Sequence, residues 1–197
     1  MQTHARIRDG LPSPVAGEVW TIGHWTHPEQ AFLQLVTAQH LDFVADVRSQ
    51  PGSRRSPQFD SENMPRWLAP AGIEYVHLPA LGGRRGRQDV DPVVNAGWRE
   101  RSFKNYADYT LTPDYQRGIE QLTELASGHR LAIMCGEPVP WRCHRLLIAN
   151  TLVARGWTVW HLIDAAPPRR HQLGQWGAPP VVDADGNLTY PPSAPPK

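Results

Sequence analysis

The sequence contains only two cysteines, Cys135 and Cys143, and no apolar run near the ~18 residues that a membrane-spanning helix needs. Two cysteines in a chain of 197 residues exclude a small scaffold held together by several disulfides. No apolar segment follows the first charged residues, so we expect no secretory signal peptide. Together these absences predict a protein of the reducing cytoplasm that has no membrane segment.

Neither sign of charge is in clear excess, since the formal net charge is only +1. A chain so close to neutral has no overall field that would draw it to nucleic acid or to a membrane surface. Lysine is nearly absent, and 18 of the 20 basic residues are arginines. Arginine suits planar, bidentate contact with phosphate or carboxylate, although a genome rich in G and C produces the same bias.

Apolar runs of strand length alternate along the chain with stretches of helical periodicity. The runs expected to form strands lie at residues 18–24, 41–49, 73–79, 130–135 and 157–163. The stretches expected to form helices lie at residues 26–40, 61–71, 102–111, 112–127 and 143–156. The alternation predicts a single three-layer α/β domain over residues 18–163, with a mostly parallel five-stranded sheet and helices on both faces.

The segments on either side of this domain have a different composition. Residues 1–17 are polar and contain two prolines, so we expect a loose N-terminal arm. Residues 164–197 are rich in proline, and we expect a C-terminal extension that lies over the surface as an arm. Within it, Asp185-Gly186 is a typical turn sequence and predicts a small hairpin.

Side chains able to carry out chemistry lie at the ends of four of the expected strands. They are His24 after the first strand, Asp46 and Arg48 at the second, His77 at the third, and Cys135 and Glu137 at the fourth. Parallel strands place their carboxyl ends at one edge of the sheet, where ligands bind in a crevice. Because loops are exposed to solvent, a polar residue at the end of one strand is common and does not indicate a site. Chemically reactive side chains at the ends of four strands predict a shared site.

Residues 135–145 contain both cysteines and run into an expected helix. If that helix begins at Arg142, its free N–H groups and its dipole favour an anion at the same edge of the sheet. Arg142 and Arg145 would add positive charge there. Cys143 would then have a lowered thiol pKa, or it packs inward as a small apolar residue. Cys135 is the second candidate for a reactive thiol.

The loop after the second expected strand carries Arg48, Arg54 and Arg55 beside Gly52, with no acidic residue among them. This pattern favours a phosphate clamp, although a solvated basic loop paired with the acidic residues that follow it is the alternative. Other loops contain aromatic residues that could stack on a nucleobase or cover the core as lids. They are Trp25, Phe59, Trp98 and Trp141.

The cysteines and neighbouring histidines also raise the question of a metal site. Cys135, Cys143, His144 and His24 would supply soft ligands for zinc. However, the two cysteines are eight residues apart with a Pro-x-Pro between them, unlike the closely paired cysteines of a zinc knuckle. We therefore predict neither a metal nor another cofactor.

Five stretches of the sequence together resemble a known family. They are "TIGHWT…F", "DVRSQPGSRRSPQF", "GIEYVHLPALGGRR", "YADY…TPDYQ" and "LAIMCGEPVPWRCHR". In this order, between about residues 19 and 163, they are similar to the bacterial family called domain of unknown function 488. The resemblance implies a cytoplasmic α/β protein and implies no activity. The family's characteristic positions are here His24, Asp46, Arg48, Pro51, Gly52, Arg54, Cys135, Glu137, Cys143, His144 and Arg145.

A fainter similarity is to the sites of rhodaneses and cysteine phosphatases, in which an Asp-x-Arg strand precedes a strand that ends in a nucleophilic cysteine. By this analogy Cys135 would be the nucleophile and Arg142 would bind the anion. The spacing between the two is longer here than in those sites, and Glu137 within the loop would repel a phosphate.

The leading hypothesis from the sequence is an enzyme that acts on a phosphate-bearing ligand, a nucleotide or nucleic acid, in the crevice. Asp46 or Glu137 would be the general base, His24 or His144 would transfer protons, and Cys135 would be the nucleophile if one is used. The residues expected to hold the phosphate are Arg48, Arg54, Arg55, Arg142 and Arg145. One alternative is a thiol-dependent sulfurtransferase or phosphatase-like enzyme, and another is a non-catalytic binding module. The sequence leaves the oligomeric state open.

Overall fold

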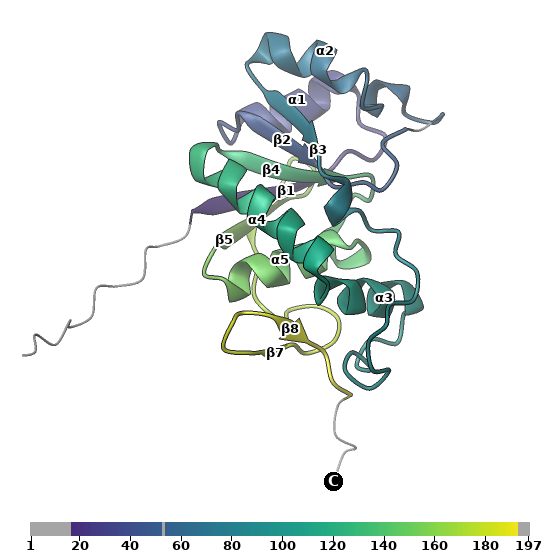
Figure 1. Cartoon of the computed structure of the whole chain (residues 1–197). Coiled ribbons are helices and arrows are strands. Elements are labelled where there is room, and N and C mark those ends of the chain that lie inside the picture. The colour runs from purple at the N-terminus through teal and green to yellow at the C-terminus, as the bar shows by residue number, and fades with distance from the viewer. Residues whose placement is uncertain (1–16, 53, 193–197) are drawn as a thin grey trace, which may run out of the picture.

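The computed structural model describes residues 17–52 and 54–192, and a mostly parallel six-stranded sheet lies at its centre (Figure 1). The arm expected for residues 1–17 lies outside this range, apart from Gly17. The strand order is β3-β2-β4-β1-β5-β6. The strands are β1 (Glu18–Gly23), β2 (Phe43–Asp46), β3 (Glu74–His77), β4 (Leu131–Cys135), β5 (Thr158–Leu162) and β6 (Arg169–Arg170). All neighbours pair in parallel except β5 and β6.

Helices cover both faces of the sheet, which confirms the predicted three-layer α/β domain (Figure 1). One layer contains α1 (Glu29–Thr37) and α2 (Met64–Leu68). The other contains α3 (Arg101–Thr110), α4 (Pro113–Gly128) and α5 (Arg145–Ala154). Alternation along the strands divides the core, since Ala132 and Met134 of β4 pack in the first layer and Leu131 and Ile133 in the second.

The sixth strand corrects the prediction of a five-stranded sheet. β6 pairs antiparallel with β5 at the sheet edge, with Arg170 opposite Trp160. It consists of two exposed arginines, so it has neither the apolar alternation nor the length by which a strand is found in a sequence.

Local sequence signals set several helix ends. Thr112 caps α4 by accepting a hydrogen bond from the Tyr115 amide, and Pro113 occupies the first helical position. Gly72 adopts a left-handed conformation with φ of 74° and ends the turn that follows α2. Among the described residues no helix is long and apolar enough to cross a membrane.

The chain after β6 returns across the layer that contains α3 and α5 (Figure 1). β7 (Val181–Val182) and β8 (Leu188–Thr189) pair as an antiparallel hairpin. Tyr190, which follows β8, is buried, and its amide donates to the Asn95 side chain at 2.9 Å. The C-terminal segment is therefore packed against the domain through residue 190.

A buried chain of hydrogen bonds joins β1, β5, α5 and the C-terminal segment. Asn150 Oδ1 can only accept, so His171 donates to it from Nε2 at 2.8 Å, and His171 Nδ1 accepts from His161 Nε2 at 3.0 Å. His161 Nδ1 in turn accepts from the Thr21 hydroxyl at 2.7 Å. The Asn150 amide donates to the Tyr190 hydroxyl at 3.0 Å. Protonation of both histidines at once would place two N–H groups opposite each other and break the bond between His161 Nε2 and His171 Nδ1.

Candidate active site

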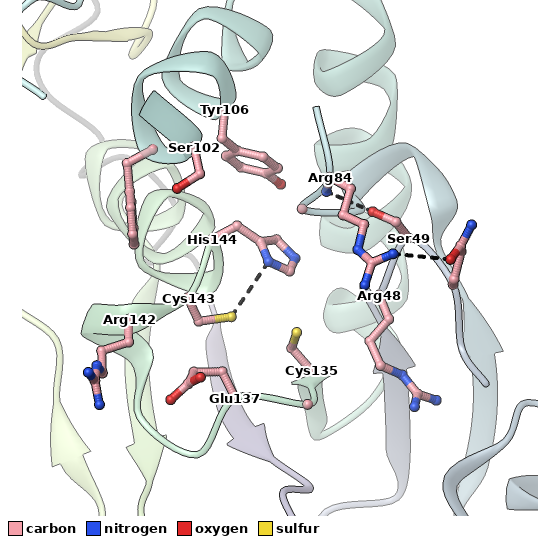
Figure 2. Close-up of a pocket in the computed structure, with 14 residues that line it drawn as sticks. Arg48, Ser49, Arg84, Ser102, Tyr106, Cys135, Glu137, Arg142, Cys143 and His144 are labelled. Atoms are coloured by element: carbon pink, nitrogen blue, oxygen red, sulfur yellow. Dashed lines mark hydrogen bonds between the residues drawn. The ribbon is translucent and has the colours of Figure 1, made fainter. Parts of the chain in front are cut away.

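A cavity of about 470 Å³ opens at the carboxyl ends of β2 and β4, beside α3 (Figure 2). It lies at the sheet edge where the sequence predicts a shared site. Side chains from four segments line it, at residues 48–50, 83–84, 102–106 and 135–144. The site therefore draws on loops after three parallel strands and on the first turns of one helix.

Asp46 and Arg48 form a buried ion pair behind this cavity. The fully buried Asp46 carboxylate accepts from Arg48 Nη2 at 2.6 Å, from Arg48 Nε at 2.9 Å and from the Tyr75 hydroxyl at 2.8 Å. Arg48 Nη2 also donates to the Phe59 carbonyl oxygen at 2.5 Å. Figure 2 shows the guanidinium pointing away from the two thiols. Asp46 lies outside the cavity lining and its lone pairs are engaged, which argues against the predicted role as general base.

His24 supports the same ion pair. Its Nδ1 donates to the Trp25 carbonyl oxygen at 2.8 Å, and its Nε2 accepts from Arg48 Nη1 at 3.1 Å. Burial and the positive charge of Arg48 lower the pKa of His24 to about 4. His24 is therefore neutral at pH 7 with both ring nitrogens occupied, and it orients Arg48 rather than facing the cavity.

Cys135, Cys143 and His144 converge within the cavity (Figure 2). The Sγ atom of Cys143 is 3.5 Å from His144 Nδ1 and 3.4 Å from Arg145 Nε. The Sγ atoms of Cys135 and Cys143 lie within 4.8 Å of each other. His144 donates from Nε2 to the Val47 carbonyl oxygen at 2.8 Å, and this bond turns Nδ1 toward the Cys143 sulfur.

The two thiols have opposite electrostatic surroundings. Burial raises the pKa of Cys143, but the neighbouring Cys135 thiol and the positive charges of His144 and Arg145 together bring it well below its usual value. The neighbouring Cys143 thiol and burial raise the pKa of Cys135 well above its usual value. The surroundings therefore favour a thiolate at Cys143 over one at Cys135.

Comparison with known proteins identifies the family at this point. The sequence model of the family described as domain of unknown function DUF488 matches residues 29–152, more than half of the chain. The chain belongs to the DUF488 family. This confirms the resemblance found in the sequence. No curated protein and no solved structure gives a significant match. The matched segment of this DUF488 protein contains every residue that lines the cavity, whereas β1 and His24 precede it.

The structure brings only some of the residues predicted for the site into the cavity of the DUF488 protein. Those that line it are Arg48, Cys135, Glu137, Arg142 and His144. Arg54 and Arg55 are exposed on the loop after β2 and do not line it. Arg145 is fully buried behind Cys143, and Figure 2 shows Arg142 pointing its guanidinium away from the sulfurs.

The predicted helix start at Arg142 is wrong. Pro140 to Arg142 form a 3₁₀ turn, Cys143 is extended with φ of −134° and ψ of 149°, and α5 begins only at Arg145. Cys143 therefore gains little from the helix dipole, which acts within the first turn. The neighbouring side chains of His144 and Arg145 provide the positive charge instead.

Several residues of the cavity were not singled out from the sequence. Ser49 and Gln50 follow the buried ion pair, Arg84 follows a Gly-Gly pair, and Ser102 and Tyr106 lie on α3. Among these segments only the glycines are a sequence signal for the site, since glycine allows the backbone to approach another group closely. Gly83 does so: a Cβ atom there would lie 2.3 Å from His144 Nδ1. The four aromatic residues noted in the loops fall into two groups. Phe59 and Trp98 are buried, whereas Trp25 and Trp141 are exposed.

The donor atoms of Cys135, Cys143 and His144 lie within 4.8 Å of one another, so these residues could hold a thiophilic cation. The bond from His144 to the Val47 carbonyl would also suit a metal-bound histidine. However, the buried guanidinium of Arg145, with Nε 3.4 Å from the Cys143 sulfur, would lie beside the ion and repel it. The arrangement favours a free thiolate over a bound metal.

Proposed function

We propose that this protein is a thiol-dependent enzyme in which Cys143 attacks an electrophilic group of an anionic small molecule bound in the cavity. This takes up the thiol alternative drawn from the sequence, with Cys143 in the place of Cys135. It retains the expectation of an anionic ligand, and a phosphate group is one that the cavity would accept. Asp46 and His24 have structural roles in the proposal.

The observation that carries the proposal is the buried charge of Arg145. Its side chain is fully buried, and within residues 17–52 and 54–192 it forms no ion pair with a carboxylate. Nε faces the Cys143 sulfur, Nη2 donates to the Glu137 carbonyl oxygen, and Nη1 has no hydrogen-bond partner in the described structure. A buried cation without a counter-charge is costly, and a Cys143 thiolate would supply that charge.

His144 is the proposed general base. His144 donates its Nε2 proton to the Val47 carbonyl oxygen. The Nδ1 lone pair therefore faces Cys143 and can accept the thiol proton. The imidazolium formed would then return a proton to the leaving group. Glu137, the one carboxylate among the residues drawn in Figure 2, lines the cavity and would contact the substrate.

The cavity walls support an anionic ligand. Arg84 and Arg142 both line it, and the polar groups of Ser49, Gln50 and Ser102 add hydrogen-bonding capacity. Arg84 is anchored by its backbone amide to Ser49 Oγ at 2.8 Å and by Nη1 to Gln50 at 3.2 Å. A guanidinium fixed in this way suits a carboxylate, sulfonate or phosphate.

The proposal predicts that Cys143 reacts with iodoacetamide at pH 7 at least ~10-fold faster than a thiol of the urea-unfolded chain. Mass spectrometry of the digested protein would locate the label, with a chelator present so that no metal covers the thiols. Cys143→Ser should lose the fast phase, whereas Cys135→Ser should retain it. Equal, slow labelling of both cysteines in the native protein would contradict the proposal.

Two arginines in the same segment provide a matched comparison. Arg145→Met removes the buried guanidinium beside the sulfur and should slow the labelling of Cys143 by about 10-fold or more. Arg142→Met removes an exposed guanidinium that points away from both sulfurs, so its labelling rate should stay close to that of the wild type. Circular dichroism would verify that both variants are folded.

Gly83→Ala tests the role of His144 without changing either thiol. The added methyl group would lie 2.3 Å from His144 Nδ1, so the imidazole must shift and lose its present alignment with the Cys143 sulfur. We expect the labelling rate of Cys143 to fall by about 10-fold, since the base is displaced. Gly86→Ala is the control in the same loop, because a Cβ atom there meets nothing within 4 Å. Equal rates in both variants would show that His144 does not activate the thiol.

A further inference from the structure

We infer that Cys135 is the resolving thiol of a two-cysteine centre, so that the enzyme reduces an anionic disulfide and closes a Cys135–Cys143 disulfide of its own. The inference rests on the proposed function, because it takes Cys143 as the nucleophile. It adds the reaction, the class of substrate and a role for the second cysteine.

The position of Cys135 carries the first step of the inference. The two sulfurs lie within 4.8 Å of each other, both residues line the same cavity, and the chain contains no third cysteine. A disulfide requires the sulfurs to approach to about 2.05 Å. Cys135 ends β4, and Cys143 lies in extended backbone before α5, so neither cysteine lies within a helix that the closure would have to unwind.

The difference between the two thiols assigns their order. Arg145 and His144 lie beside the Cys143 sulfur, whereas the Cys135 sulfur has no hydrogen bond to a charged side chain among the described residues. In thiol–disulfide exchange a thiolate attacks the substrate first and forms a mixed disulfide. The second thiol stays protonated until it attacks that mixed disulfide.

The cavity favours an organic anion over a small oxidant. A volume of about 470 Å³ accommodates a molecule of many atoms, and Arg84 and Arg142 provide positive charge on its walls. Glu137 lines the same cavity and would contact a cationic group. A disulfide that carries carboxylates together with an ammonium group matches this lining.

The reaction balances without any further reactant. The Cys143 thiolate, whose proton His144 has taken, attacks one sulfur of the substrate R–S–S–R; Cys143–S–S–R forms, and His144 returns its proton to the leaving R–S⁻, which becomes R–SH. The sulfur of Cys135 then attacks the Cys143 sulfur, its proton passes to His144 and on to the second leaving thiolate, and the internal disulfide forms. The substrate gains two electrons and becomes two thiols, and the two cysteines lose the same two electrons.

Trapping of the mixed disulfide tests this inference. Reduced protein is mixed with glutathione disulfide, an anionic probe, and analysed as intact protein by mass spectrometry. The wild type should lose about 2 Da as the internal disulfide forms. Cys135→Ser should instead hold one glutathione on Cys143, and Cys143→Ser should gain none on the same timescale. The neutral probe 2-hydroxyethyl disulfide should react with the wild type about 10-fold more slowly.

Each contrary outcome has a distinct meaning. If Cys143 is labelled rapidly by iodoacetamide but Cys135→Ser traps no glutathione, the inference fails and the proposed function stands. A wild type that keeps glutathione bound without closing the disulfide would show that Cys135 is not the resolving thiol. If Cys143 is not labelled rapidly, the proposed function itself fails. Cys135→Ala provides a second trapping variant should the serine variant be unfolded.

A pair of arginine variants tests whether positive charge on the cavity wall selects an anionic substrate. Arg84→Gln should reduce the preference for glutathione disulfide over the neutral probe by about 10-fold, because Arg84 lines the cavity. Arg87→Gln changes an exposed arginine of the same loop that does not line the cavity, and it should leave the preference unchanged. An equal preference in wild type and Arg84→Gln would overturn the assignment of an anionic substrate.

Discussion

Asp46→Asn is expected to lower the free energy of unfolding by about 3–5 kcal/mol, because it removes one partner of a buried ion pair. Arg48 has only 8% of its surface exposed, and its guanidinium donates to both carboxylate oxygens of Asp46. An asparagine keeps one oxygen but directs an NH₂ group at donors from Arg48 and Tyr75. The variant is left with an uncompensated buried cation. Urea unfolding at pH 7 would measure the resulting loss in the free energy of unfolding.

A second acid-to-amide substitution provides the control for this prediction. Asp114 pairs with Arg117 on the surface, where the side chains are 67% and 68% exposed, so Asp114→Asn should cost less than about 1 kcal/mol. The double variant Asp46→Leu/Arg48→Met removes both charges and should be more stable than Asp46→Asn. If the double variant is the less stable one, the buried charge does not determine the effect.

The same ion pair shows how far the sequence could predict the site. Asp46 and Arg48 were correctly placed at the end of a strand that borders the crevice. Their two-residue spacing places both side chains on one side of the strand, where they bind each other. The sequence could not distinguish an aspartate that faces a cavity from one that holds an arginine behind it, because the outcome depends on Tyr75 and Phe59 from distant segments.

The sequence places both cysteines and His144 near one edge of the sheet, but it does not give the separate roles that we propose for them. Both cysteines and His144 were candidates, and they do converge. Their roles depend on Arg145, whose burial behind Cys143 follows from α5 beginning after the prolines of the loop. Arg84 and the α3 side chains enter the cavity through packing of elements far apart in the chain, which no local pattern reveals. The strand alternation, in contrast, is local, and it predicted the layers of the fold.

Acidification is expected to destabilise the fold steeply below pH 6.5, because burial lowers the pKa of the two histidines of the hydrogen-bonded chain in the folded protein. Burial and the charges of His171, Arg145 and Arg169 lower the pKa of His161 to about 3, and burial lowers that of His171 to about 4. In the unfolded chain both titrate near 6.5. The unfolded state therefore binds protons first as the pH falls, and each histidine removes about 1.4 kcal/mol of stability per pH unit. Stability is complete above pH 6.5 and is lost between there and pH 3–4.

Urea unfolding at pH 7 and pH 5 measures this effect, which amounts to about 2 kcal/mol for each histidine over that interval. His171→Gln keeps a donor toward Asn150 and an acceptor for His161 but cannot be protonated. The loss of stability between the two pH values should therefore be about 2 kcal/mol smaller in this variant than in the wild type. His40→Asn changes an exposed residue at positive φ, which asparagine tolerates, and should show the wild-type pH dependence. A wild-type stability that is the same at both pH values would mean that the buried histidines accept protons without breaking their hydrogen bonds.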